Sequence, residues 1–433
     1  MGQQADIIDR YQRAISETEQ ILLYPFVMES QEGARMVGVD GDNPIDLFAS
    51  WAVGSTGYRH PTILNRIEQQ LEKGYTNSPI TIPHEPLVEL AERLLERFPG
   101  EFDTKVWFGH SGSEAGDLIS RSVPDIASGD AIVSFEGGYH GATKGSAAIS
   151  GHTAQEGVGS ESDVTLPFPY PYRASDPNEE RDAILNELAA TFDRHDVGAV
   201  ITEPIQSDGG IRVPPAGFIS SVASMCHDND AYFIVDEVKA GLGRTGSFWA
   251  FDHYDIVPDA VMLGKPLGSG VPISAVIGRQ ELVDYEPATH MMTTAGSPLA
   301  AAAGVGTLDV IESEDLPERA TSLGKQFRSY LADESSSIDT VGDIRGRGLM
   351  CGIELVETDS DMPNLDLTAQ TVFRARELGV LVAYVGMESN VLEITPPLTI
   401  EKEELLEAAD RLVEAIKTAR EVDTGRLEKY AGW

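Results

Sequence analysis

The sequence predicts an α/β fold with a mostly parallel central sheet, accompanied by a smaller α+β domain. Between about residues 100 and 280, short apolar runs alternate with segments long enough to form helices. A cluster of small or reactive residues follows each run, and the pattern changes beyond about residue 310. Alternating strands and helices are typical of parallel sheets covered by helices on both faces. A chain of 433 residues is long enough for two such domains.

Five apolar runs are the predicted strands of the central sheet. In chain order they are KVWF (105–108), AIVSF (131–135), AVIT (199–202), YFIV (232–235) and AVMLG (260–264). A helix is predicted over 86–98, where apolar residues recur at helical spacing, namely Leu87, Leu90, Leu94 and Phe98.

Three segments are predicted to form the two domains. Residues 51–309 form the large domain, and residues 1–50 are expected to join 310–433 in the small one. Within the last segment, the amphipathic stretch TSLGKQFRSYLADE leads to GRGLMCGIELVE and then to a C-terminal helix around KEELLEAADRLVEAIKTA.

The charge of the chain is strongly negative. Its 32 Lys and Arg residues stand against 70 Asp and Glu residues, a formal net charge of −38, and the acids are spread along the whole chain. Such a surface repels nucleic acid and anionic membranes. Counterions screen its self-repulsion in concentrated salt, so we predict a halophilic source.

The remaining composition is typical of a soluble cytoplasmic enzyme without a metal site. Two cysteines, Cys226 and Cys351, cannot form a disulfide framework. The polar, acidic N-terminus MGQQADIIDRYQRAISETEQ is not a signal peptide, and no apolar stretch is long enough to span a membrane. The nine histidines lack metal-ligand spacing.

The clusters that follow the predicted strands are expected to meet in one site. KVWF is followed by GHSGSEA, AIVSF by EGGYHG, AVIT by EPIQSDGG, YFIV by DEV and AVMLG by Lys265. Ligands of parallel sheets bind beyond the carboxyl ends of the strands. Asp236 ends one of these runs, and a buried carboxylate needs a positively charged partner.

Two of these clusters are suited to a phosphate and a flat ring. Ser111, Gly112 and Ser113 precede a helical stretch, where hydroxyls and free N–H groups attract an anion, although plain helix capping explains them equally well. Tyr139 is flanked by glycines and could stack on a heterocycle; as alternatives, Tyr139 is a core residue and His140 a structural histidine.

The segment GLGRTG (241–246) has the glycine spacing of dinucleotide sites but lacks their context. A helix should begin at the third glycine, with an acid about twenty residues later. Instead, SFWAFDHY follows and Asp259 comes too early, so we expect these glycines to shape a loop.

Lys265 follows a buried strand, where a lysine either forms a salt bridge or serves as a Schiff-base amine. Pyridoxal 5′-phosphate requires a Schiff-base lysine, an aspartate for its pyridinium nitrogen and a phosphate-binding site.

The motifs, in their order, resemble those of the class III aminotransferases, which are fold type I pyridoxal-phosphate enzymes. They are EGARMVGVDGD (32–42), GYRHP (57–61), SGSEA, YHG, EPIQSDGG, DEVKAGLGRTG, LGKPLGSG, HMMTTAGSPLA (290–300), RGRGLMCGIEL (345–355) and TPPLTI (395–400).

The resemblance implies a role for each predicted site residue. Lys265 is implied as the Schiff-base lysine and proton carrier, and Asp236 as the partner of the pyridinium nitrogen. Ser111, Gly112 and Ser113 are implied to hold the phosphate, Tyr139 and Val238 to cover the two ring faces, His140 and Glu203 to flank the cofactor, and Trp51 to line the substrate pocket. Thr293 is implied to reach the phosphate of a neighbouring subunit, so a homodimer or dimer of dimers with interfacial sites is expected.

Three positions depart from the pattern of the family, and a fourth matches it. Lys239 stands where many relatives carry a glutamine that donates to the cofactor, and Gly116 replaces an asparagine, which we expect to matter little. Glu393 stands where many relatives carry an arginine that binds the substrate α-carboxylate. Asp208 matches the acidic gate residue that pairs with this arginine.

Carboxylates at 208 and 393 would repel a substrate carboxylate. We therefore expect an amine or an ω-amino compound as donor, with Arg173 and Arg212 as candidates for binding a keto acid.

The favoured reaction is amino transfer to a keto acid such as pyruvate or 2-oxoglutarate in ping-pong order. The alternative is an amino-acid racemase or isoleucine 2-epimerase, because a branch of the family with these activities has similar local segments: VWFGHSGS (106–113), LPFPYPYR (166–173), PISAVIGR (272–279), TTAGSPL (293–299) and LEKYAGW (427–433). An acidic binding protein on a borrowed fold is a third reading, which the presence of both Lys265 and Asp236 disfavours.

Overall fold

The computed structural model describes all residues except 1, 153–154, 156–157, 159–162, 428–429 and 431–433, so most of the ending 427–433 lies outside the described residues. The chain folds into two compact units. Unit 1 comprises Met1–His60 and Arg319–Trp433, and unit 2 comprises Pro61–Glu318. The domain boundaries at 50 and 309 stay a prediction.

Unit 2 contains one large sheet and its helices. Its strands are β4 (Thr104–Gly109), β5 (Ala131–Phe135), β6 (Val164–Leu166), β7 (Val197–Thr202), β8 (Tyr232–Asp236), β9 (Ala260–Leu263) and β10 (Ser274–Arg279). Its helices are α3 (Pro61–Lys73), α4 (Glu85–Arg97), α5 (Gly112–Ile126), α6 (Lys144–Ala148), α7 (Pro177–Arg194), α8 (Phe218–Asp228), α9 (Gln280–Val283) and α10 (Pro298–Ser313), with 3₁₀ helices η3 (Ala250–Tyr254) and η4 (Lys265–Gly268).

The seven strands lie in the order β4-β10-β9-β8-β7-β5-β6. Only β10 runs antiparallel to its neighbours in this sheet of described residues; the pairs among β5 to β9 are parallel. The prediction of a mostly parallel sheet is therefore confirmed, as are all five predicted strands. The helix predicted over 86–98 is α4, which is offset by one residue at each end.

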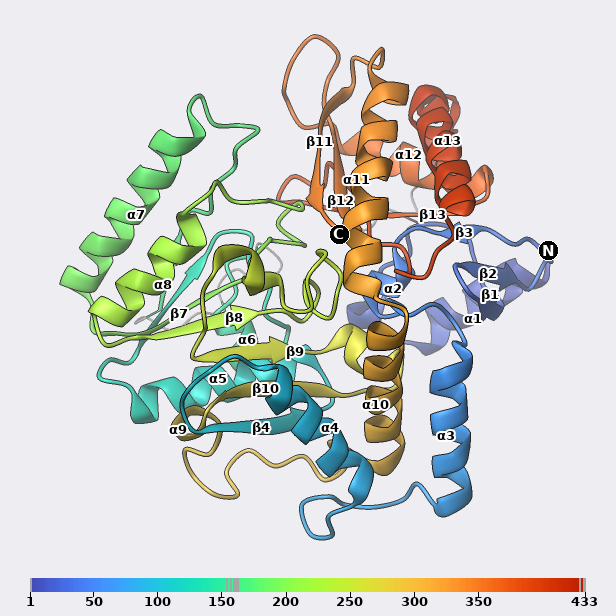
Figure 1. Ribbon diagram of the computed structural model, residues 1–433. Coiled ribbons are helices and arrows are strands. Elements are labelled where there is room, and N and C mark those ends of the chain that lie inside the picture. Colours follow the sequence, from blue (N-terminus) through green and yellow to red (C-terminus); the bar gives the residue numbers. More distant parts are fainter. Residues whose placement is uncertain (1, 153–154, 156–157, 159–162, 428–429, 431–433) are drawn as a thin grey trace. The chain divides into compact units, whose positions relative to one another are not determined.

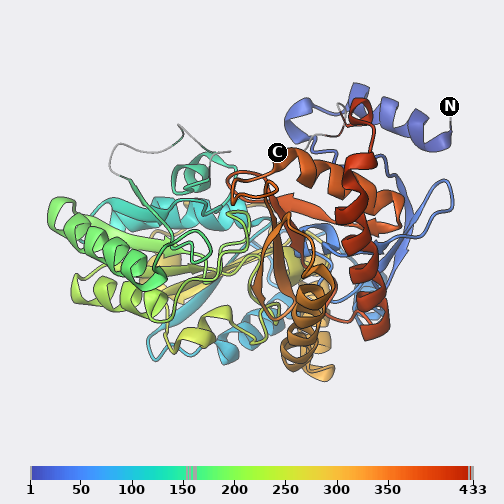
Figure 2. The ribbon, with the colours of Figure 1, turned by 90° about the horizontal axis from the view of Figure 1, so that it is seen from above.

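Successive side chains of a strand point to opposite faces of this sheet. In β5, Ile132 packs in a cluster with Leu118 of α5. Phe135 instead contacts Phe218 of α8, with ring centroids 5.6 Å apart. Helices therefore cover both faces, as Figures 1 and 2 show, which explains why all five residues of β5 are buried.

Unit 1 contains two four-stranded sheets, ordered β1-β2-β3-β13 and β11-β12-β15-β14. The strands are β1 (Met28–Glu32), β2 (Arg35–Gly38), β3 (Ile45–Asp46), β11 (Val341–Arg347), β12 (Met350–Leu355), β13 (Val380–Leu381), β14 (Ala383–Val385) and β15 (Val391–Ile394). The helices are α1 (Gln3–Ala14), the short turn α2 (Ala49–Ala52), α12 (Leu365–Glu377) and α13 (Lys402–Thr418), with 3₁₀ turns η1 (Glu17–Glu19), η5 (Ala419–Glu421) and η6 (Thr424–Arg426). Helix α11 (Leu316–Ser335) begins at the boundary between the units.

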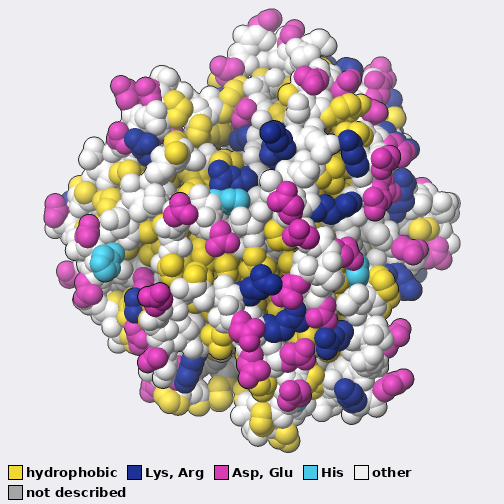
Figure 3. Space-filling view, in the orientation of Figure 1, with side chains coloured by type: hydrophobic (Ala, Val, Ile, Leu, Met, Phe, Trp, Pro, Cys, Tyr) yellow, Lys and Arg dark blue, Asp and Glu magenta, His cyan; other side chains and the backbone are white. Residues whose placement is uncertain are grey.

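Acidic residues outnumber basic ones in the chain, 70 to 32. Asp and Glu side chains are dispersed over the face shown in Figure 3 and are not gathered in one patch. Within the described ranges, no helix has the length and apolar character needed to cross a membrane.

Candidate active site

The start of α5 faces the ends of two other strands. Ser111 caps the helix by accepting a hydrogen bond from the N–H of Glu114 at 3.3 Å, as the capping interpretation expected. A Cβ added to Gly112 would lie 2.9 Å from Val238, and one added to Gly264 would lie 3.3 Å from the backbone nitrogen of Gly112. The segments after β4, β8 and β9 therefore meet around Gly112, at a helix N-terminus of the kind that attracts an anion.

The loop after β5 closes over the same turn. The hydroxyl of Ser113 accepts a hydrogen bond from the N–H of Ala142 at 3.1 Å. A Cβ added to Gly116 would lie 2.8 Å from the carbonyl oxygen of His140 and 2.7 Å from Cβ of Ser146. Gly116 therefore permits the close approach of this loop, because a side chain there would displace it, and the expectation that the departure matters little stays a prediction.

Asp236 ends β8 as a buried carboxylate with two protein contacts. The Nδ1–H of His140, which is also buried, donates to Asp236 Oδ2 at 2.7 Å. The N–H of Val238 donates to Asp236 Oδ1 at 2.9 Å. These contacts fix the carboxylate in position.

Glu203 binds the backbone of Tyr139. It accepts hydrogen bonds from the N–H of Tyr139 at 3.2 Å and from the N–H of Ser207 at 2.8 Å. Burial, followed by the charge of Asp236, raises the pKa of Glu203 to about 7. Glu203 thus links the loop after β7 to the loop after β5.

Lys265 directly follows Gly264 at the end of β9. Its φ is 33°, outside the conformations that a lysine normally adopts. Strained backbone of this kind clusters at functional sites, where the surrounding structure enforces it. Lys265 is half-buried, and its charge acts on Asp208.

Lys239 and Asp208 form a buried ion pair. Lys239 Nζ lies 3.1 Å from Asp208 Oδ1, and the two side chains are 3% and 8% exposed. Burial opposes ionisation of Asp208, but the charges of Lys239 and then Lys265 outweigh it and lower its pKa to about 2. Lys239 thus compensates the charge of Asp208, while the repulsion of a substrate carboxylate by residues 208 and 393 stays a prediction.

The two predicted pocket residues of unit 1 occupy different elements. Trp51 lies in α2, and its ring is half-buried at 5.9 Å from that of Phe48. Glu393 lies in β15 and is fully buried; its Oε1 accepts a hydrogen bond from the hydroxyl of Thr395 at 3.3 Å.

The two arginines proposed for a keto acid lie against aromatic rings. The guanidinium of Arg212 is 4.1 Å from the ring centroid of Tyr170, and that of Arg173 is 5.1 Å from the ring centroid of Tyr172. Such contacts orient a guanidinium group while leaving it charged.

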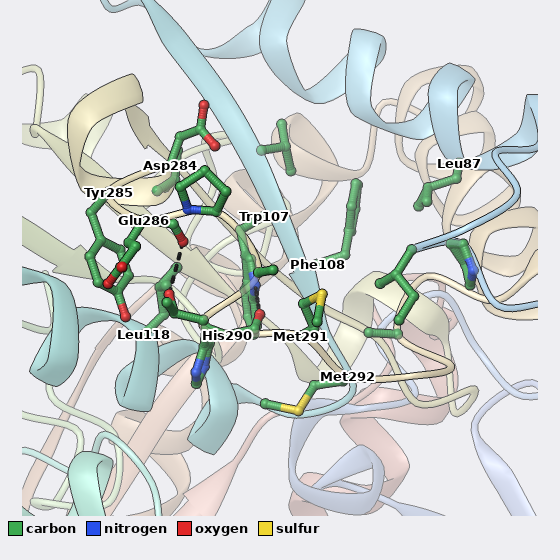
Figure 4. Close-up of a pocket in the computed structure, with 18 residues that line it drawn as sticks. Leu87, Trp107, Phe108, Leu118, Asp284, Tyr285, Glu286, His290, Met291 and Met292 are labelled. Atoms are coloured by element: carbon green, nitrogen blue, oxygen red, sulfur yellow. Dashed lines mark hydrogen bonds between the residues drawn. The ribbon is translucent and has the colours of Figure 1, made fainter.

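Thr293 is exposed, and it lies in none of the strand-end loops described above. Its neighbour Thr294 is linked to the α5 turn, because the Thr294 hydroxyl lies 2.9 Å from Nε2 of His110. The segment carrying both threonines also lines a pocket of about 280 Å³ with both polar and apolar walls, shown in Figure 4. There the indole of Trp107 donates to the carbonyl oxygen of His290 at 2.9 Å.

Glu237 has a structural role that the sequence left unassigned. It accepts hydrogen bonds from the N–H groups of Ala250 and Phe251 at 2.9 and 2.8 Å. Burial raises its pKa to about 8. The carboxylate of Glu237 is thus used by the backbone of η3, whereas that of Asp236 contacts His140. The glycines of 241–246 shape a loop as expected, with Gly243 and Gly246 at φ of 92° and 102°.

A model of the family described as aminotransferase class-III matches residues 15–416. The chain is 35% identical to isoleucine 2-epimerase from Lentilactobacillus buchneri over 447 residues, covering 99% of this chain and 98% of the relative. It is 32% identical to alanine/serine racemase from Pyrococcus horikoshii over 447 residues, covering 98% of this chain and 92% of the relative.

Among solved structures, the fold is similar to that of the omega transaminase from Pseudomonas jessenii in complex with PMP. The TM-score is 0.86 at 27% identity, covering 95% of both chains.

Proposed function

This chain belongs to the class III aminotransferase family of pyridoxal-phosphate enzymes, and from that membership we propose that it inverts the configuration at Cα of amino acids. The proposed activity is that of a racemase or 2-epimerase, the alternative raised by the sequence. The two relatives named above act, by their names, on isoleucine and on alanine and serine. We therefore propose amino acids with uncharged side chains as substrates.

Pyridoxal 5′-phosphate is the cofactor of this family, and the residues at the strand ends fit it. The first turn of α5 offers hydroxyls and N–H groups to a phosphate. Gly112 leaves space beside Val238 that a side chain would fill. Asp236 supplies a carboxylate for the ring nitrogen, held by His140.

We assign each predicted residue accordingly. The proposed cofactor residues are Ser111, Gly112, Ser113, Tyr139, His140, Glu203, Asp236, Val238, Lys239 and Lys265, with Thr293 acting on a neighbouring subunit; the proposed substrate-pocket residues are Trp51, Asp208 and Glu393.

Lys265 and Asp236 have distinct roles in the proton transfers of the proposed reaction. When bound, pyridoxal phosphate withdraws electrons and makes the substrate Cα–H bond acidic. Lys265 Nζ carries the proton to or from Cα. Asp236, fixed by His140 and by the N–H of Val238, would place its carboxylate at the ring nitrogen. A water molecule on the opposite side of Cα would return a proton there, which gives the other stereoisomer, and the proton held by Lys265 Nζ would pass to solvent.

The observation that most supports racemase or 2-epimerase activity is the buried ion pair of Lys239 and Asp208. An aminotransferase admits two different substrates to one pocket in turn, and many relatives have an arginine and an acidic gate residue whose pairing can open. Here the acid at 208 is bound to Lys239, and position 393 is a glutamate. A racemase binds one substrate and its stereoisomer, which carry the same charges, so a fixed pair is sufficient.

The reaction is tested without a keto acid. The holoprotein is incubated with L-isoleucine, L-alanine or L-serine in D₂O and concentrated KCl, because we propose that the acidic surface belongs to the cytoplasm of a salt-rich cell. Chiral chromatography is expected to show D-allo-isoleucine, D-alanine or D-serine accumulating, with deuterium at Cα. Unchanged stereochemistry, with keto product appearing only after pyruvate or 2-oxoglutarate is added, would contradict the proposal.

Amino transfer from an amine or ω-amino donor to pyruvate or 2-oxoglutarate is the second candidate. It is favoured by Glu393, which replaces the arginine that binds an α-carboxylate in many relatives. The likeness to an omega transaminase supports it as well. In the same assay, acceptor-dependent product from 4-aminobutyrate or 1-phenylethylamine would establish this reaction.

We also propose that the active unit is a homodimer or a dimer of dimers. Large apolar side chains are exposed on one stretch of unit 2 and on the segment of Thr293, namely Leu71, Tyr75, Ile80, Ile82, Val88 and Met291. Exposed apolar side chains gathered in this way mark protein–protein contacts. Ile80 and Met291 also line the cavity of Figure 4.

Size-exclusion chromatography with light scattering is expected to give at least twice the 46.7 kDa of one chain. Ile82→Asp should reduce this mass to that of one chain, because a charge cannot be buried unpaired in an interface. Val257→Asp, at a side chain 50% exposed elsewhere in unit 2, is the matched control and should leave the mass unchanged. A wild-type protein of 46.7 kDa would contradict the proposal.

A further inference from the structure

Four consecutive residues of α2 have left-handed backbone conformations. Their φ angles are 47° at Ala49, 53° at Ser50, 61° at Trp51 and 63° at Ala52. None of them is glycine, and a left-handed turn of other residues costs free energy at each position. The local sequence therefore disfavours this turn, and contacts outside it must hold the conformation.

A buried carboxylate holds the beginning of the turn. Asp46 is fully buried, and its Oδ1 accepts hydrogen bonds from the N–H groups of Phe48 at 2.9 Å and Ala49 at 3.0 Å. The hydroxyl of Tyr58 donates to its Oδ2 at 2.5 Å. Both oxygens of Asp46 are thus used to fix this segment.

The same tyrosine reaches into the turn. The hydroxyl oxygen of Tyr58 lies 2.9 Å from the hydroxyl oxygen of Ser50, the residue before Trp51. Because the Tyr58 hydrogen is given to Asp46, the Ser50 hydroxyl donates to Tyr58. Asp46, Tyr58 and Ser50 therefore form a chain of hydrogen bonds from β3 to the neighbour of Trp51.

The backbone on the other side of the turn is also fixed. The N–H of Thr395 donates to the carbonyl oxygen of Leu47 at 2.7 Å, and its hydroxyl donates to the carbonyl oxygen of Phe48 at 3.1 Å. These bonds hold the start of the turn in place, so the hydrogen-bond chain sets the direction of the residues that follow.

We propose that Asp46, Tyr58 and Ser50 are positioning residues that aim the indole of Trp51. This inference depends on the proposed function in one respect, namely that Trp51 lines the substrate pocket. It implies that a left-handed turn without glycine contributes to substrate specificity. Loss of the Tyr58 hydroxyl should release the turn and let the indole adopt more than one orientation.

Fluorine NMR of protein labelled with 5-fluorotryptophan tests this inference without substrate or cofactor. The chain has four tryptophans, and Trp51→Phe identifies the resonance of Trp51. In Tyr58→Phe, this resonance is expected to shift and broaden or split. Tyr24→Phe is the matched control, since the Tyr24 hydroxyl is buried in the same cluster without a hydrogen-bond partner among the described residues. It should leave the resonance unchanged.

Kinetics of the holoprotein provides the second measurement. Tyr58→Phe is expected to raise KM about tenfold while kcat changes less, because binding contacts are affected more than proton transfer. Ser50→Ala retains the hydrogen bonds of Asp46, so it should change KM and the Trp51 resonance in the same direction as Tyr58→Phe but to a smaller extent. It replaces Tyr58→Phe in both measurements if that variant does not fold.

An unchanged Trp51 resonance in both Tyr58→Phe and Ser50→Ala would overturn the inference. A changed resonance with unchanged KM would uphold the positioning role but refute the placement of Trp51 at the substrate. The two failures are thus distinguishable.

Discussion

Lys265→Ala is expected to lower the rate of Cα proton exchange by about 10²–10⁴-fold, the usual contribution of a general acid–base group. The variant should still bind pyridoxal phosphate without a covalent bond, because Asp236 and the first turn of α5 are unchanged. Absorbance spectra of the dialysed variant measure cofactor retention, and loss of the Cα proton signal in D₂O measures the rate.

One further variant tests whether the amine of Lys265 or only its positive charge is needed, and another serves as a control. Lys265→Arg keeps the positive charge but cannot exchange a proton at neutral pH, so its rate should fall as far as that of the alanine variant. Lys144→Ala removes an exposed lysine from α6 and should leave the rate unchanged. A Lys265→Ala protein with a rate within about tenfold of wild type would exclude this lysine as the proton carrier.

Lys239→Met is expected to lower the free energy of unfolding by about 3–5 kcal/mol, because it leaves Asp208 buried without its partner. The double variant Lys239→Met/Asp208→Asn should recover most of this loss, since no buried charge remains. Urea denaturation at neutral pH measures all of these free energies. The matched control is Arg194→Met, which breaks a surface pair with Glu187 whose side chains are 56% and 52% exposed. It should change stability by less than about 1 kcal/mol.

The pH dependence of wild-type stability provides a check on the same pair. The pKa of Asp208 is about 2 in the folded protein, below the value of about 3.9 for a free aspartate. A carboxylate with a lowered pKa contributes stability above its unfolded pKa and loses it as the pH falls through its folded pKa. The contribution of the pair should therefore be complete above about pH 4 and disappear toward pH 2. A double variant as unstable as Lys239→Met would contradict this account.

The strands and their order along the chain could be predicted because each one is an apolar run that ends in a reactive cluster. Parallel strands bring their carboxyl ends to one edge, so Asp236 and Lys265 were expected in one site before any geometry was known. The antiparallel β10 could not be foreseen, since the run containing Val276 and Ile277 looks like any buried strand.

The partners of individual side chains could not be predicted in the same way. Lys239 and Asp208 are 31 residues apart and meet because β7 and β8 are neighbours in the sheet. The neighbouring positions of β7 and β8 cannot be read from the sequence, so the ion pair of Lys239 with Asp208 was not foreseen beside the proposed cofactor contact of Lys239. The left-handed turn at Trp51 was also unpredictable, because its sequence contains no glycine and the cause lies in the buried contacts of Asp46.

The central claim is that Lys265 anchors the cofactor opposite the carboxylate of Asp236. Borohydride reduction of the holoprotein, followed by digestion and mass spectrometry of the peptides, tests it most directly. The predicted result is a single modified peptide carrying the reduced cofactor at Lys265, absent from Lys265→Ala. Modification of another lysine, or none in protein that retains the yellow cofactor, would contradict the account.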